Sequence, residues 1–159
     1  HDLYPADPAE CTKIDWYLHS HHRGIRDASL AFFAPNVRKD LTFPPTFLDS
    51  AQKAFTRSLH SLEKNWLDKS RFIAGDSLSI ADLAAYVEIG QLRPQFTNLF
   101  DFKQLPNVRR WMNDIAEIDS HDVAHTALTI LGDISLKAPD MEAVITANKQ
   151  GYKAIIDRQ

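Results

Sequence analysis

The amino-acid sequence predicts an all-α protein, a helical bundle of five to six helices that forms one domain over residues 1–159. Apolar residues recur every three or four positions through most of the chain, the spacing of one helix face. Runs that alternate apolar and polar residues, as strands do, are few. Proline and capping residues also stand where several of these segments begin.

The first helix is expected to begin at Pro8. Asp7 is a good N-cap, proline suits the first helical position, and Glu10 completes a capping box. The periodic pattern continues to Ala34, and because a residue before proline avoids the α conformation, the helix is expected to stop there, before Pro35. Residues 36–45 are then expected to form a loop.

Two further long helices are expected over residues 46–67 and 80–92, joined by a turn at 70–76. Ser79 is placed to cap the second of these, and Asp82 can reach back to the Ser79 amide, so the pair forms a capping box with a structural role. This helix is apolar on most sides, so we expect it to be central and buried. The apolar residues are Ile80, Leu83, Ala84, Ala85, Val87 and Ile89.

Pro106 is expected to open the fourth helix. A short helix is expected over about 120–131. The last helix is expected to follow Pro139 and to end near Asp157. The C-terminal tail, residues 132–159, is expected to carry this last helix. Its apolar side chains are expected to dock it on the bundle: Met141, Val144, Ile145, Tyr152, Ile155 and Ile156.

Composition excludes several classes of function. The net charge is −3, so the chain has no basic footprint for nucleic acid. No apolar run approaches the length of about 20 residues that a membrane span needs. Cys11 is the single cysteine, so no internal disulfide is available, which fits a reducing compartment such as the cytoplasm.

Four segments resemble the C-terminal helical domain of theta-class or theta-like glutathione transferases. One is Phe72 to Leu83, a pattern that most classes of the superfamily share. The others are Leu3 to Pro8, His22 with Ile25-Arg26, and Leu105 to Trp111. A weaker similarity lies in Ala124-His125.

The resemblance implies a two-domain, usually homodimeric enzyme that joins glutathione to hydrophobic electrophiles or uses it to reduce peroxides. A thioredoxin-like domain would bind the glutathione and activate its thiol. No residue here corresponds to that domain, so we expect a chain whose beginning is missing, with residues 1–7 left from the linker, and no activity on its own. The alternative is a non-catalytic interaction module like those in translation factors and synthetase assemblies.

Arg26 is the strongest candidate for substrate binding, because the resemblance places its guanidinium in the cleft between domains, where it can hold an anionic group. The alternative is an ordinary surface arginine. His22 and Arg23 are expected to lie beside the same cleft. Arg23 departs from the acidic residue of some theta enzymes, so that residue's contact with glutathione in the other subunit does not carry over.

Two aromatic residues and two histidines complete the candidates. Phe33 and Tyr86 are candidate walls of an apolar pocket, although aromatic residues at helical spacing more often belong to the core. His121 and His125 have the spacing of a metal-binding pair on a helix. Asp122 is shorter than the required Glu and no third ligand follows, so we expect no metal site. No catalytic residue is assigned to the chain.

Overall fold

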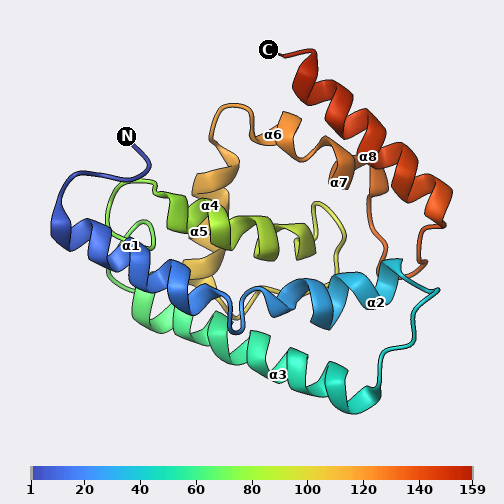
Figure 1. Ribbon diagram of the computed structural model, residues 1–159, viewed down its shortest axis with the longest axis horizontal. Coiled ribbons are helices and arrows are strands. Elements are labelled where there is room, and N and C mark those ends of the chain that lie inside the picture. Colours follow the sequence, from blue (N-terminus) through green and yellow to red (C-terminus); the bar gives the residue numbers. More distant parts are fainter. Residues whose placement is uncertain (1, 159) are drawn as a thin grey trace.

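The computed structural model describes residues 2–158, so both ends of the predicted domain, His1 and Gln159, lie outside the described residues. All of the regular secondary structure in this part of the chain is helical, which confirms the predicted fold class (Figure 1). Its eight α-helices exceed the expected five to six because two expected helices are interrupted. They are α1 Pro8–His21, α2 Ala34–Val37, α3 Pro45–Ser61, α4 Ile80–Ile89, α5 Pro106–Ala116, α6 His121–Ala124, α7 Thr126–Leu131 and α8 Met141–Ile156.

The expected continuous helix from Pro8 to Ala34 is wrong. Helix α1 ends at His21, and a turn over residues 22–26 leads to a short helical stretch that runs into the π-helical segment η1, Ser29–Phe33. Gly24 in this turn has a φ of +124°, a conformation that interrupts a right-handed helix and favours glycine. Pro35 does not end the helix either: η1 continues directly into α2, and Pro35 is the second residue of α2.

The helices expected over residues 46–67 and 80–92 agree closely with the structure, whereas the one expected over 120–131 is divided. Helix α3 continues into a second π-helical segment, η2, Leu62–Trp66, and α4 continues into the 3₁₀ turn η3, Gly90–Leu92. The expected helix over 120–131 is divided into α6 and α7 at His125, whose φ is −103° and whose ψ is 10°. The structure therefore reproduces the order of the expected segments while breaking two of them.

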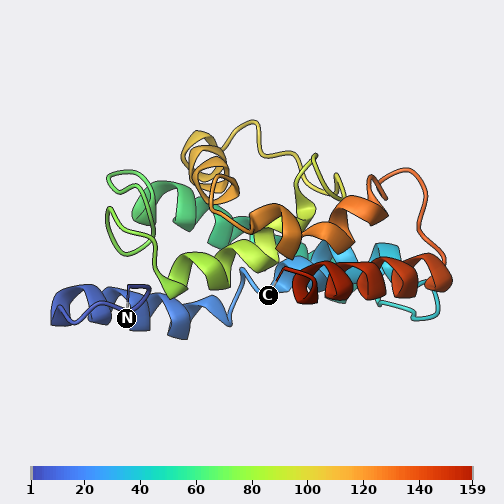
Figure 2. The same cartoon turned by 90° about the horizontal axis from the view of Figure 1, so that it is seen from above.

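Helix α4 lies at the centre of the molecule (Figure 1). In Figure 2, α1 and α8 lie toward one face and α5 toward the opposite face, with α4 between them. Ala81, Ala85 and Ile89 of α4 are completely buried. The expectation that this helix is buried on most sides is only partly correct, because Ile80 is 44% and Val87 is 61% exposed. Within residues 2–158, one side of α4 is therefore left without a neighbouring helix.

The N-terminus of α4 is closed by Ser79 and Asp82. The Asp82 carboxylate accepts hydrogen bonds from the Ser79 backbone N–H at 2.9 Å and from the Ser79 hydroxyl at 2.7 Å. It also accepts one from the backbone N–H of Ile73, at 2.8 Å. Asp82 is completely buried. The carboxylate thus ties the turn before α4 to the first turn of the helix.

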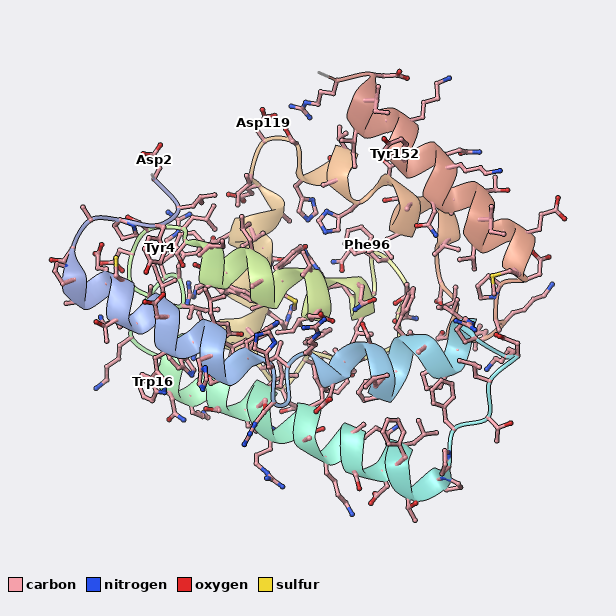
Figure 3. All side chains as sticks on the ribbon, viewed as in Figure 1. Asp2, Tyr4, Trp16, Phe96, Asp119 and Tyr152 are labelled. Atoms are coloured by element: carbon pink, nitrogen blue, oxygen red, sulfur yellow. The ribbon has the colours of Figure 1, made fainter. Side chains whose placement is uncertain are left out.

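Helix α8 is attached to the bundle by small residues and not mainly by the large apolar side chains that the sequence favours. Ala147 is completely buried, and a Cβ added to Gly151 would lie 2.9 Å from the Cβ of Ala127 in α7. Tyr152 is 69% exposed, and its place on α8 is marked in Figure 3. Close backbone approach, and not a thick apolar layer, holds the tail on α6 and α7.

Candidate functional site

The turn after α1 places Arg26 on the surface. Gly24 allows the turn to approach α3 closely, because a Cβ at this position would overlap the Ser58 Oγ. Arg26 is exposed, and one of its guanidinium nitrogens, Nη1, lies 3.4 Å from the Nδ1 of His22. Arg23 of the same turn is also exposed. The structure thus brings together the three predicted polar residues of this region.

A hydrogen-bonded group on η1 and α4 adjoins Arg26. The Ser29 hydroxyl donates to Glu88 Oε2 at 3.1 Å, and the Gln91 side-chain amide donates to the Ser29 hydroxyl at 3.0 Å. Burial raises the pKa of Glu88, and the Ser29 hydrogen bond and the positive charge of Arg26 oppose that rise. Sequence analysis did not select Glu88. Glu88 lies one turn before Gln91 on α4, and no sequence motif marks it. Only the folded turn after α1 brings Arg26 near it.

The exposed side of α4 supplies an apolar surface next to these polar groups. Ile80 and Val87 are exposed and Leu83 and Ala84 are half-buried. These four residues recur at helical spacing and are called here the α4 apolar face. Helix α8 packs on α6 and α7 and leaves both Arg26 and Val87 exposed. An apolar molecule, or another domain, can therefore reach this surface.

The two aromatic candidates do not lie on the α4 apolar face. Phe33 is half-buried and packs against the hydrophobic core. Tyr86 is 2% exposed and turns to the other side of α4, where its hydroxyl lies 2.8 Å from the His121 Nε2 and accepts a hydrogen bond from Arg93 Nη1 at 2.8 Å. Both side chains belong to the interior in this structure, in line with the core alternative.

His121 and His125 stack on each other, with ring centroids 4.2 Å apart. The His121 Nδ1 lies 3.2 Å from an Asp122 carboxylate oxygen, and the His125 Nδ1 lies 2.7 Å from the His121 carbonyl oxygen. Phe96, which is labelled in Figure 3, stacks on His125 with ring centroids 5.2 Å apart. Three of the four ring nitrogens of this pair therefore have partners in the chain. Within residues 2–158, no group of three or more His, Cys, Asp or Glu side chains is placed to hold a metal ion.

Comparison with known proteins shows what this chain is similar to. The family model described as glutathione S-transferase, C-terminal domain, matches residues 45–114. Glutathione S-transferase D6 of Drosophila melanogaster is 28% identical over 116 residues, which are 73% of this chain and 50% of that protein. Glutathione S-transferase theta-1 of Gallus gallus is 28% identical over 123 residues, 72% of this chain and 44% of that protein.

A solved structure agrees in fold. Human glutathione-S-transferase T1-1, in its apo form, superposes with a TM-score of 0.69 over 97% of this chain and 66% of that chain, at 20% sequence identity. The chain spans about half the length of the curated relatives it matches.

These matches make the chain similar to the C-terminal domain of glutathione transferases, and the all-helical fold agrees with that similarity. Theta enzymes are among the relatives that align over most of the chain. Among residues 2–158, no helix combines the length and the apolar character that crossing a membrane requires.

Proposed function

We propose that this chain is the electrophile-binding half of a cytoplasmic, homodimeric enzyme that conjugates glutathione to small hydrophobic electrophiles or uses it to reduce peroxides. The observation that carries the proposal is the exposed Arg26 beside the unpartnered α4 apolar face. A guanidinium next to apolar surface suits a substrate that carries an anionic group at one end and an apolar body at the other.

The chemistry assigns different roles to the two parts of this surface. Attack on an electrophile requires the glutathione thiolate, which a hydrogen bond or a positive field must stabilise. Arg26 would hold an anionic group or the charge that develops on the electrophile. The α4 apolar face would bind the hydrophobic part of the substrate, and Glu88 and Ser29 would hold the η1 segment against α4.

Thiolate activation and most of the binding of glutathione are assigned to a thioredoxin-like domain outside these residues. The chain by itself is therefore expected to be inactive. The test compares this chain with the full-length protein, using glutathione and either an aryl chloride activated by nitro groups or an organic hydroperoxide. Turnover by the isolated chain would overturn this part of the proposal.

The role of Arg26 has its own matched test in the full-length protein. Arg26→Gln is expected to lower kcat/KM about tenfold, which corresponds to roughly 1.4 kcal/mol of lost transition-state stabilisation. Arg57→Gln removes the same charge from an exposed position on α3 and serves as the control. Equal kcat/KM values for the two variants would exclude Arg26 from the site.

The alternative, a non-catalytic interaction module, predicts a surface that is flat or that the tail of the chain covers. The exposure of Arg26 and Val87 and the placement of α8 on α6 and α7 favour the enzyme. A full-length protein without turnover toward either substrate class, but with a stable protein partner on the α4 apolar face, would support the module.

A further inference from the structure

A pocket of about 220 Å³ lies on the other side of α4 from Arg26, between the segment after η3, the loop at 101–103 and helix α5. Its polar wall contains Arg93, Lys103 and Arg109, and its apolar wall includes Phe102 and Met112. The pocket carries three cationic side chains and one carboxylate, that of Asp101. It belongs neither to the Arg26 surface nor to the α4 apolar face.

Arg93 is the unusual member of this pocket. It is 6% exposed, and its three hydrogen bonds go to neutral acceptors: the Tyr86 hydroxyl, the Met112 carbonyl oxygen and the Asn113 side-chain oxygen. Within residues 2–158, no carboxylate lies within 4.0 Å of its guanidinium. Since arginine cannot lose its proton in a protein, a full positive charge is buried here without a counter-charge.

The neighbouring groups do not neutralise that charge. Burial raises the pKa of Tyr86, so its hydroxyl stays protonated and neutral. The Asp101 carboxylate lies 3.6 Å from the Lys103 ammonium and is mostly exposed. The nearby Asp114 pairs with Arg71 and Arg110 instead. The C-terminal half of α5, which holds Met112 and Asn113, contributes only a partial negative charge.

We propose that this pocket binds a small organic anion, a carboxylate whose apolar body lies against Phe102 and Met112 while its charged group meets Arg93, Arg109 and Lys103. A guanidinium has five N–H donors in a planar fork that matches a carboxylate. Arg93 uses three of them in hydrogen bonds within the protein, which leaves two for a bound anion. A cavity of about 150 Å³ accepts benzene, so a pocket of about 220 Å³ accommodates a benzoate-sized molecule. This proposal is independent of the proposed function.

Calorimetric titration of the chain at low ionic strength tests the pocket with three probes. Benzoate has both the charge and the apolar body, benzyl alcohol has the body alone, and inorganic phosphate has the charge alone. We expect benzoate to bind more tightly than either of the others. Benzyl alcohol or phosphate that binds as tightly as benzoate would overturn the assignment of an organic anion.

Two double variants decide whether the pocket is responsible. Lys103→Gln with Arg109→Gln removes two charges at the pocket, and Arg57→Gln with Lys149→Gln removes two from exposed positions on α3 and α8. The first pair is expected to weaken benzoate binding at least about tenfold and the second less than about twofold. Equal losses, or no loss in the first pair, would contradict the proposal.

Arg93→Met, checked for folding by circular dichroism, should abolish the benzoate signal. If this variant does not fold, the amide resonances of Gln95, Lys103 and Asn113 in the unsubstituted chain decide. Benzoate must shift these three resonances. Shifts confined to the surface around Arg26 would place the anion elsewhere and refute the site.

Discussion

Asp82 and Trp111 are joined by a hydrogen bond of 2.9 Å from the indole Nε1–H to Asp82 Oδ1. Trp111 lies on α5 and is completely buried, as Asp82 is. The same carboxylate accepts the hydrogen bonds of Ser79 and Ile73. One buried carboxylate therefore fixes the start of α4, the turn before it and the packing of α5. Its hydrogen bonds satisfy donors that would otherwise be left unpaired.

Asp82→Ala is expected to destabilise the chain by about 3 kcal/mol, because it leaves buried N–H donors on Ile73, Ser79 and Trp111 without an acceptor. Denaturant unfolding followed by circular dichroism measures this change in the free energy of unfolding. Asp76→Ala, at an exposed position in the same turn, is the control and should change it by less than about 0.5 kcal/mol. Similar values for both variants would show that the carboxylate has no such role.

Glu63 performs the corresponding task for α5. This buried side chain accepts hydrogen bonds from the backbone N–H groups of Asn107 at 3.2 Å and Val108 at 2.9 Å, at the N-terminus of that helix. Glu63→Gln removes the favourable negative charge and replaces one acceptor oxygen, so it should lower the free energy of unfolding by about 1–2 kcal/mol. Denaturant unfolding measures this loss. Glu117→Gln, at an exposed position, is the control and should leave the free energy of unfolding unchanged.

Gly24→Ala should lower the free energy of unfolding by at least about 1–3 kcal/mol. The φ of +124° is unfavourable for a side chain, and the new methyl group would overlap Ser58. Gly75→Ala is the matched control, because a Cβ there meets no atom within 4 Å. A thermal melt of both variants gives the comparison, and a Gly24→Ala variant as stable as the control would mean that the turn after α1 adopts another conformation.

His125 predicts a pH dependence of stability. Burial is the main cause that lowers its pKa below 6.5, and the neighbouring His121 and Arg93 side chains act in the same direction. The hydrogen bond to the His121 carbonyl and the Asp122 carboxylate act against it. Because the unfolded chain then binds the proton more readily than the folded chain, stability is full above about pH 6.5 and falls as the pH drops below it.

Unfolding free energies measured between about pH 7 and 5 should show this decline. His125→Gln should reduce the slope, whereas His19→Gln, at an exposed position, should not. Some slope should remain, since burial also lowers the pKa of His21. An identical slope in both variants would assign the pH dependence to other groups.

The helix starts could be predicted from sequence because capping is local: Asp7 and Ser79 stand directly before the helices that they cap. The break after α1 could not be, because the close approach of Gly24 to Ser58 depends on a helix more than 30 residues away. Arg26 was selected through the family resemblance. Its neighbour Glu88 was missed, because only packing brings α4 beside η1.

The sequence by itself determined the all-helical class, the order of the helices and the cap of α4, since periodicity and capping act within one or two turns of the chain. Tertiary structure decided which helix faces are exposed, the interior positions of Tyr86 and Phe33, and the uncompensated charge of Arg93. These depend on contacts between segments distant in sequence, where burial and the pairing of charges are settled only when the whole bundle packs.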